Sequence, residues 1–595
     1  MAPRLPYPYA TGIPFQSNRS PVVGTRGMVA CTQPLASQIG LDILKRGGNA
    51  ADAAVAVAAA LCVLEPYSTG LGGDCFCLFY NASTRKVDGI NGSGRSAAGI
   101  SLDHVKKVIG PNATELPQTS GLAVNVPGAV AGMLDTLEAF GSGLIDRKTA
   151  LEPAIQLARE GFPVSPITAQ TWSRSAEKLK RISPNSHDFL INGHGPRSGQ
   201  IMTNVNMARS LEIISNEGKA GFYQGEIAQA IVDAVTAHGG LLTTEDLANH
   251  TSIPVKPIRA QYQGVEVFEC PPNGQGLTVL MALKYLEEFE RTGKIRPFSA
   301  MVPGSAEHYH PLIEALRLSF VDTRWYVCDP ASRLPPALPA EETLLDQAYL
   351  TRRARLFDPH RRMTDLRHAS DGRPLPGCDT VYFAVVDGRG NACSFVMSIY
   401  SNFGTCIIPE IRGSCSPLTN SNSSSATVGF ALHNRGCGFS LDPTSLNALG
   451  PAKRPYHTII PGLPVVSVAG DPATMDDGEL LYCFGVMGKF MQPQGHVQTL
   501  VHMLGFGHDP QTALDGPRFR LNLDEDTVSI EETPATATVV ADLERLGHKV
   551  EVVRGIGRHD MGRGQIISRT HDEESQRFVL TGASEPRADG QAVGW

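Results

Sequence analysis

The sequence predicts an α+β fold in which helices and short strands occupy different parts of the chain. Residues 148–350 read mainly as helices, with a β-rich interruption at 255–270. From Thr380 onward the pattern changes to short strands, the first of them at 380–386 and 392–399. Because neither half shows a closed alternation of elements, we expect strands from both halves to share sheets.

The N-terminal part combines two helices with a hairpin. A strand at 28–31 is followed by a helix at 35–46, which stops at Gly47-Gly48. Asn49 can cap an alanine-rich helix at 51–64, whose small side chains indicate burial and close backbone approach. A glycine-rich turn then leads into a hairpin at 75–90. Further strands are expected at 405–408, 429–433, 480–486 and 549–553, and further helices at 126–140, 492–504 and 539–546.

Composition narrows the functional class. The 595 residues carry 52 Lys and Arg against 59 Asp and Glu, a net charge of -7, which gives no reason to expect nucleic acid or an anionic membrane as partner. No apolar run approaches the length of a membrane span, and residues 1–26 read as a flexible lead-in without the apolar core of a secretion signal. We therefore predict a cytoplasmic protein. The 12 cysteines form no C-x-x-C pair and read as buried small side chains.

Several common chemistries are missing from the sequence. It contains no H-E-x-x-H, no P-loop and no G-x-S-x-G motif. His433, His457 and His496 lack metal-ligand spacing and are interpreted as structural or substrate-lining residues. We expect neither a metal nor a cofactor.

Thr380 is the main candidate for chemistry. It begins an apolar strand just after the Arg- and Pro-containing segment 352–376, which has the composition of an exposed, cleavable stretch. A cut before Thr380 would give this residue a free α-amine beside its own hydroxyl, and the amine could then activate the hydroxyl as a nucleophile. The alternative interpretation is that Thr380 is an ordinary β-former at the start of a core strand.

The order of several motifs resembles the γ-glutamyltransferase (glutathione hydrolase) family over nearly the whole chain. The resemblance rests on the segments 47–56, 70–73, 126–132, 242–247, 314–320, 453–455 and 582–587. It implies a four-layer αββα sandwich of the N-terminal-nucleophile hydrolases. It also implies self-cleavage between Asp379 and Thr380, into a large subunit (27–379) and a small subunit (380–595) that remain together as a heterodimer in one domain.

The resemblance assigns roles around Thr380. Ser398 stands where the family has a second Thr that supports the nucleophile's amine. The backbone amides of Gly488 and Lys489 match the family's oxyanion loop, although the family has a second glycine where this chain has Lys489. Two segments depart from the family pattern: 410–427 is longer and could block maturation, whereas 441–450 is short where many relatives have a lid.

The family's substrate-binding residues are not all present in this chain. The family's carboxylate-gripping Arg aligns with Ser93, so Arg95 is the nearest substitute, and its amine-binding Asp aligns with Gly438. His457 and Thr458 replace a serine pair. These departures are typical of the family's cephalosporin-acylase-like branch. The residues expected to line the pocket are Arg95, Asn434, Arg435, His457 and Thr458.

Three functions follow as expectations. The first is a self-processing enzyme that cleaves γ-glutamyl amides, such as glutathione or its conjugates, through a Thr380 acyl-enzyme and transfers the acyl group to water or an amine. The second is an acylase for other carboxylate-bearing amides of glutaryl or cephalosporin type in a biosynthetic pathway. The third, of another class, is a non-maturing binding scaffold.

Overall fold

A computed structural model describes residues 19–332, 341–364, 379–415, 425–466 and 478–595. Two large sheets dominate it, and every strand pairing within them is antiparallel. The seven-stranded sheet runs in the order β22 (Gln591–Gly594), β2 (Gly27–Cys31), β10 (Asp379–Asp387), β11 (Ala392–Tyr400), β3 (Asp74–Asn81), β4 (Lys86–Gly92) and β7 (Ile253–Val255).

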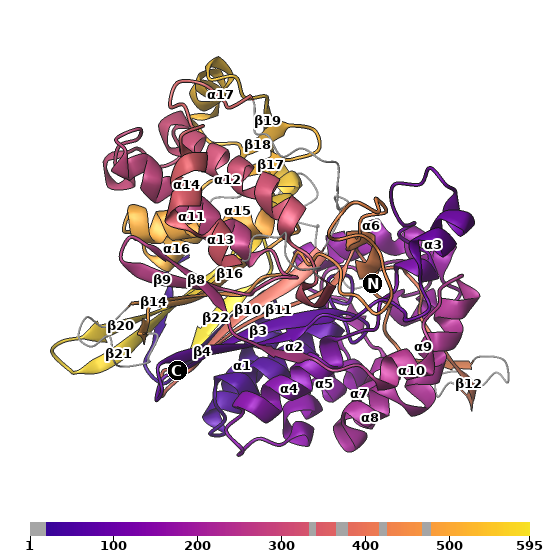
Figure 1. Ribbon diagram of the computed structural model, residues 1–595. Coiled ribbons are helices and arrows are strands. Elements are labelled where there is room, and N and C mark those ends of the chain that lie inside the picture. The colour runs from indigo at the N-terminus through magenta and orange to yellow at the C-terminus, as the bar shows by residue number, and fades with distance from the viewer. Residues whose placement is uncertain (1–18, 333–340, 365–378, 416–424, 467–477) are drawn as a thin grey trace, which may run out of the picture.

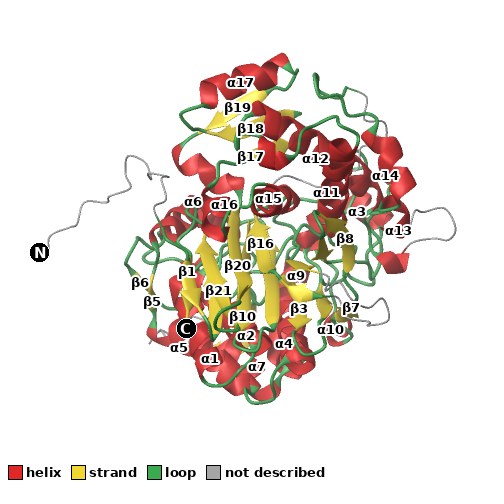
Figure 2. Ribbon diagram, turned by 90° about the vertical axis from the view of Figure 1, so that its left-hand side faces the viewer, coloured by secondary structure: helices red, strands yellow, loops and turns green. Residues whose placement is uncertain are grey.

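The eight-stranded sheet lies against the first. Its order is β1 (Val22–Gly24), β21 (Arg577–Ser584), β20 (Arg563–Asp572), β16 (Tyr482–Met487), β14 (Gly462–Val466), β9 (Val265–Glu269) and β8 (Ile258–Tyr262), with β15 (Glu479–Leu480) paired to β14. Figure 2 shows β1, β21, β20 and β16 side by side in this order. Smaller sheets join β17 (Phe519–Asn522), β18 (Thr527–Glu531) and β19 (Val550–Val553), then β12 (Glu410–Cys415) and β13 (Ser425–Thr427), and β5 (Phe162–Pro163) and β6 (Ile201–Met202).

Helices cover the outer faces of both sheets (Figure 1). Beside the seven-stranded sheet lie α1 (Pro34–Lys45), α2 (Ala50–Leu64), α4 (Ala129–Phe140), α5 (Arg147–Glu160) and α7 (Val205–Glu217), with α3 (Leu102–Ile109), α6 (Pro166–Ile182), α8 (Lys219–Tyr223), α9 (Gly225–Ala237) and α10 (Thr244–Ala248) further out. Beside the other sheet lie α11 (Gly276–Arg291), α12 (Ala306–Tyr326), α13 (Glu341–Leu344), α14 (Gln347–Ala354), α15 (Met491–Leu500), α16 (Pro510–Asp515) and α17 (Thr536–Arg545).

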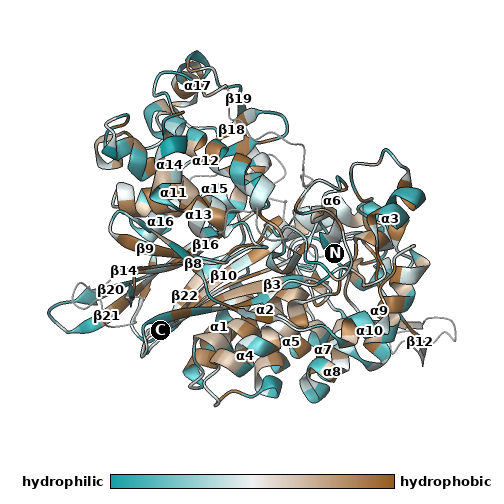
Figure 3. Ribbon diagram, in the orientation of Figure 1, coloured by the Kyte–Doolittle hydropathy of each residue, from teal (hydrophilic) through white to brown (hydrophobic). Residues whose placement is uncertain are grey.

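Three separate apolar cores follow from this arrangement. One joins the seven-stranded sheet to its helices, a second joins the eight-stranded sheet to its own, and the third takes side chains from both sheets. Along β10, Val381, Phe383 and Val385 belong to the first core, whereas Tyr382 and Ala384 belong to the third. A strand buried on both faces is apolar at successive positions, as the sequence of β10 is. In Figure 3 the strands are coloured mainly brown, and the outer helices have teal faces.

The expectation that both halves of the chain share sheets is confirmed. Strands β10 and β11, from after the predicted cut, lie between β2 and β3, from before it. The alanine-rich helix α2 is also confirmed: all of its residues are buried, and Asn49 and Asp52 form a capping box at its start. Its first N–H, that of Ala50, donates to Asp387 Oδ2 at 3.1 Å, which fixes the helix to the turn after β10.

Two predicted strands are not strands in the structure. Residues 405–408 and 429–433 do lie side by side, because the Thr405 N–H donates to Leu432 O (2.9 Å) and the Leu432 N–H donates to Ile407 O (3.0 Å). However, Phe403, Gly404 and Cys406 all have positive φ angles (54°, 54° and 63°). Such angles turn the backbone out of the extended conformation and prevent a regular ladder.

Two further segments depart from expectation. The end of the predicted flexible lead-in forms β1, which pairs with β21, while residues 1–18 lie outside the described residues. The long segment 410–427 begins and ends as the paired strands β12 and β13, and its middle, 416–424, is not described. Strand β12 packs against α9, and Figure 1 shows it at the edge of the molecule, away from β10. Among the described helices, none is long and apolar enough to cross a membrane.

Candidate active site

Adjacent strands of the seven-stranded sheet bring polar residues to the same end of the sheet. Asp379 of β10 pairs with Tyr400 of β11, Ser398 of β11 pairs with Asp74 of β3, and Cys75 pairs with Gly92 of β4. Thr380, Ser398 and Asp74 therefore follow one another across neighbouring strands. By strand alternation they share faces with the inter-sheet core residues Tyr382, Val396 and Phe76. The site thus lies at the edge of the space between the two sheets.

Thr380 is buried and its hydroxyl contacts Ser398. Thr380 Oγ1 donates to Ser398 Oγ at 3.3 Å, and Ser398 Oγ also accepts from the Tyr400 N–H at 2.9 Å. The chain is continuous here, so the nitrogen of Thr380 belongs to the peptide bond with Asp379. The predicted nucleophile and its predicted supporting hydroxyl are therefore neighbours in the uncut chain.

The predicted oxyanion loop connects β16 to α15. Gly488 and Lys489 both have positive φ angles, 134° and 64°. Within the described residues, neither of their backbone N–H groups has a hydrogen-bond partner. A lysine in the left-handed region is uncommon, and such outliers cluster at functional sites. Lys489 therefore keeps the left-handed backbone conformation that the family's glycine would adopt at this position.

Arg563 joins this loop to Thr380. Its Nη2 donates to the carbonyl of Thr380 (3.4 Å), and its Nε contacts Sδ of Met487, the residue before Gly488, at 3.1 Å. Its guanidinium also pairs with the buried Glu65 at 3.4 Å. One side chain therefore contacts both Thr380 and the residue that precedes the predicted oxyanion loop.

A buried polar cluster, made of Asp74, His433, Arg435, His457 and Thr458, continues the site across the sheet. His457 Nε2 donates to Asp74 Oδ2 at 3.1 Å, and His433 Nδ1 lies 3.3 Å from the same oxygen. Burial alone would raise the pKa of Asp74, but the charge and hydrogen bonds of the two histidines outweigh it and hold the pKa well below 3.8. Burial, reinforced by the charge of Arg435, lowers the pKa of His457 to about 3.

Arg435 has more hydrogen-bond donors than the cluster has acceptors for them. Its Nη1 donates to Thr458 Oγ1 at 3.0 Å and its Cζ lies 4.4 Å from the centre of the Tyr400 ring. Its Nε is 3.7 Å from Asp74, and neither Nε nor Nη2 has a hydrogen-bond partner among the described residues. A fully buried guanidinium with free N–H groups is the donor geometry that binds a carboxylate.

The other predicted pocket residues take different positions. Arg95 is half-buried, and its guanidinium has no partner in the described part of the chain. Burial, with the charge of Arg95 as the second cause, lowers the pKa of Arg454 to about 10. Asn434 uses both amide hydrogens within the chain, on Gln118 O and Ser401 Oγ, so it braces the loop around the site. His496 lies elsewhere and pairs with Glu269 at 2.7 Å.

Sequence reasoning did not single out several residues of the site. Asp74, Arg563 and Glu65 were all missed, as was Gln275, which donates to the carbonyls of Thr458 (2.5 Å) and Lys489 (3.3 Å). For Asp74 a signal existed, because a carboxylate stands at the head of an otherwise apolar strand after a glycine-rich turn. For the others the sequence held no such signal.

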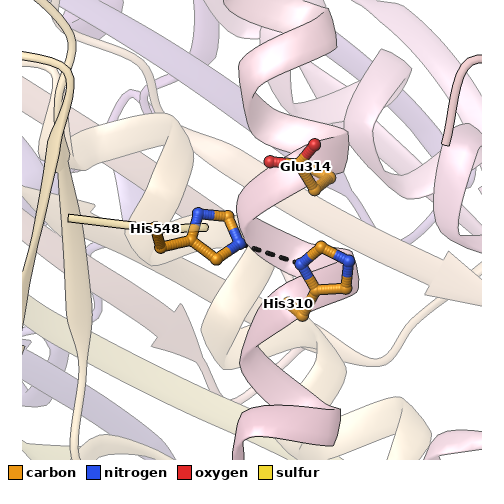
Figure 4. Close-up of side chains that lie close together, drawn as sticks. All are labelled: His310, Glu314 and His548. Atoms are coloured by element: carbon orange, nitrogen blue, oxygen red, sulfur yellow. Dashed lines mark hydrogen bonds between the residues drawn. The ribbon is translucent and has the colours of Figure 1, made fainter. Parts of the chain in front are cut away.

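A second group of side chains has the spacing of a metal site. Ligand atoms of His310, Glu314 and His548 lie within 4.8 Å of one another, and all three residues are buried (Figure 4). His310 and Glu314 are one helical turn apart on α12, and His548 immediately precedes the region of β19.

The atoms of this second group are engaged with protein partners. His310 Nε2 donates to Asp358 O at 2.9 Å, so its Nδ1 is the acceptor for His548 Nε2, also at 2.9 Å (Figure 4). Glu314 accepts from Arg317 Nη1 (2.7 Å) and from the Met363 N–H (2.7 Å). We interpret the group as a latch that ties α12 to two loops, and we call it the histidine latch.

The comparisons with known proteins define the class. The family model described as Gamma-glutamyltranspeptidase matches residues 36–595. The chain therefore belongs to the γ-glutamyltranspeptidase family, whose members are hydrolases and acyltransferases made as proenzymes. The predicted enzyme class is thereby confirmed.

The names of similar proteins describe more than one activity. The chain is 35% identical to the "Glutathione hydrolase-like YwrD proenzyme" of Bacillus subtilis over 96% of this chain and 99% of that protein. It is 30% identical to the "Oxamate amidohydrolase proenzyme" of Klebsiella pneumoniae, over 96% and 99%. The crystal structure of cephalosporin acylase from Bacillus halodurans matches with a TM-score of 0.83 and 38% identity, over 100% of this chain and 99% of that one.

Proposed function

We propose that this chain is a self-processing amidohydrolase and acyltransferase whose nucleophile is the hydroxyl of Thr380. The observation that carries the proposal is the hydrogen bond from the Thr380 hydroxyl to Ser398. Arg563 also contacts Thr380 and the residue before Gly488, and the N–H groups of Gly488 and Lys489 have no partner among the described residues. The three cores described above also support a four-layer αββα sandwich of the N-terminal-nucleophile type.

Maturation needs only groups that are already at the site. Thr380 Oγ attacks the carbonyl carbon of Asp379, the C–N bond breaks, and the nitrogen takes up the proton lost by the hydroxyl as it becomes the α-amine. The resulting ester is hydrolysed by water, which releases the Asp379 carboxylate and restores the hydroxyl. Residues 27–379 and 380–595 then form two subunits, whose strands remain interleaved because β10 and β11 lie between β2 and β3.

The mature site would use the new α-amine as its base. An α-amine has a pKa of about 8, so part of it is neutral at pH 7 and can accept the proton of the Thr380 hydroxyl. The hydroxyl oxygen bonds to the substrate carbonyl, the amide C–N bond breaks, and the proton passes to the departing amine. Water or an amine then attacks the ester and regenerates Thr380. The N–H groups of Gly488 and Lys489, which have no partner among the described residues, would stabilise the oxyanion.

The polar cluster favours an acyl group with a carboxylate and no α-ammonium group. Arg435 has free donors for the carboxylate, whereas Asp74 is occupied by His457, by the Gly94 N–H (3.0 Å) and by its ion pair with His433. A side chain at Gly438, the position of the family's amine-binding Asp, would start 2.7 Å from Tyr456 O. We therefore place the glutaryl-type acylase function ahead of the γ-glutamyl function. The relative named for oxamate, itself a carboxylate-bearing amide, supports this order.

The test has two parts. The intact mass of the purified protein should show a small subunit that begins at Thr380. A single uncut chain would instead support the non-maturing scaffold. Hydrolysis of glutaryl p-nitroanilide should then be faster than hydrolysis of the γ-glutamyl anilide, which differs only by the α-ammonium group. The reverse order would return the γ-glutamyl function to first place.

A further inference from the structure

The outer side of the Gly488–Lys489 loop lines a cavity of about 240 Å³. The cavity lies between the start of α15 and the segment 520–525, and it shares no lining residue with the polar cluster around Arg435. In the proposed reaction, three groups surround the substrate's carbonyl carbon, and each needs its own place in the site. The oxyanion faces the loop amides, the acyl group extends toward Arg435, and the amine part of the substrate remains for the cavity.

Cationic and anionic side chains both line this cavity. Lys489, Arg324 and Arg520 are half-buried and Glu525 and Asp560 are exposed, whereas the side chain of Asp524 is 27% exposed and pairs with Arg324. Water and salt screen exposed carboxylates, while half-buried cations keep more of their field. Because Asp524 offsets Arg324, the positive field within the cavity comes mainly from Lys489 and Arg520.

These cations are not fully paired. Lys489 has no ion-pair partner in the part of the chain that the structure describes. Arg324 contacts Asp524 at 3.3 Å and lies over the Phe490 ring at 5.1 Å, but its buried Nε has no partner there. Among the residues that the structure describes, Arg520 donates only to uncharged oxygens, Asn522 Oδ1 (2.9 Å) and Asp560 O (3.4 Å).

We propose that this cavity is the subsite for the amine part of the substrate, and that Lys489 selects amines carrying an anionic group such as a carboxylate. The inference rests on the proposed function. Lys489 then has two separable roles: its backbone N–H faces the oxyanion, and its ammonium group meets the anionic group of the leaving or incoming amine. An aromatic part of that amine can pack on Phe490, which also lines the cavity.

The test compares two leaving groups on one acyl group. Substrates are glutaryl p-nitroanilide and its analogue with an added ring carboxylate, and the readout is the ratio of their kcat/KM values. The native enzyme should favour the carboxylated anilide, and rising salt should reduce that preference. Lys489→Gln and Arg520→Gln should each lower the ratio, by about tenfold for Lys489→Gln, since a charge-assisted hydrogen bond is lost. The exposed Lys148 supplies the matched control, and Lys148→Gln should leave the ratio unchanged.

A second variant separates the backbone of Lys489 from its side chain. Lys489→Gly keeps the left-handed conformation accessible but removes the ammonium group, so the ratio should fall as in Lys489→Gln. A mature, active enzyme whose ratio is the same in all variants would overturn the subsite and leave the proposed function intact. An enzyme that is never cut, and hydrolyses neither anilide, would overturn both.

Discussion

The polar cluster and the histidine latch are built from the same kinds of residue. Each contains two buried histidines and one buried carboxylate, and in each at least one histidine has its pKa lowered to about 3. They differ in what remains unsatisfied. The polar cluster leaves two nitrogens of Arg435 without partners, whereas the ligand atoms of the latch are all engaged within the chain.

The difference shows that residue types alone do not define a functional site. A buried donor without a partner costs about 1–3 kcal/mol. Such donors also occur elsewhere in the described chain, as at Arg518 Nε, so the free nitrogens of Arg435 point to a ligand only together with the position of the polar cluster. The polar cluster also stands in line with Thr380 across the sheet, while the latch is built on α12, on the outer side of the other sheet. The histidine latch has the spacing of a metal site, but its ligand atoms are engaged with the protein, so we interpret it as a structural link.

The largest effect is expected at Thr380. Thr380→Ala removes the hydroxyl on which both cleavage and turnover depend, so the chain should stay uncut and without amidase activity. Thr380→Ser keeps the hydroxyl and should still be cut. Intact mass and anilide hydrolysis measure both outcomes. Two subunits from the Thr380→Ala chain would exclude Thr380 as the nucleophile.

The next effect separates the two clusters directly. Arg435→Lys keeps the charge but loses the two-pronged donor, so kcat/KM for glutaryl p-nitroanilide should fall by about 10- to 100-fold. The matched variant in the latch is Arg317→Lys, which alters the partner of Glu314 and should leave kcat/KM unchanged. Steady-state kinetics of the two mature enzymes test this. Similar losses in both would mean that the clusters do not differ as proposed.

The third effect concerns stability against pH. Burial lowers the pKa of His548 to about 3, from 6.5 in the unfolded chain, so the unfolded state binds more protons between these values. The stabilisation is complete above pH 6.5 and is lost as the pH falls toward 3, by up to about 1.4 kcal/mol per pH unit. His548→Gln should flatten this dependence, measured by urea unfolding between pH 7 and 5.

His457→Gln provides the contrast for that measurement. The pKa of His457 is lowered for the same main reason, burial, so its replacement should flatten the pH dependence in the same direction. Only His457→Gln should also lower kcat/KM, because only His457 lies in the polar cluster. A loss of activity in His548→Gln at pH 7, without a loss of folded protein, would contradict the structural role of the latch.

The smallest effect is expected from metal removal. Because the ligand atoms of the latch are engaged with protein partners, dialysis against EDTA should change neither the melting temperature nor the anilide kinetics. Added zinc should not raise the melting temperature either. A zinc-dependent rise that is lost in His310→Gln would identify the latch as a metal site.

The sequence predicted the elements better than the contacts between them. Strands β10 and β11 and helix α2 follow from unbroken apolar runs and a capping residue, which are local properties. The strands expected at 405–408 and 429–433 failed because positive φ angles at Phe403 and Cys406 are set by tertiary packing and have no clear local signature. Arg563 could not be predicted as a partner of Thr380, since 183 residues separate them.

The sequence by itself predicted which residue could act: a threonine at the head of an apolar strand, in a chain with the motif order of one enzyme family. The segment 352–376, whose composition predicts cleavage before this threonine, lies outside the described residues from 365 onward. Only the tertiary structure decided what surrounds that threonine. Asp74 accepts hydrogen bonds from His457, a residue 383 positions away, and from the Gly94 N–H, while Nε and Nη2 of Arg435 keep no hydrogen-bond partner among the described residues. Whether a buried charge is satisfied depends on all the groups that meet it in space, and the strand pairing that brings them together is not written in any one segment.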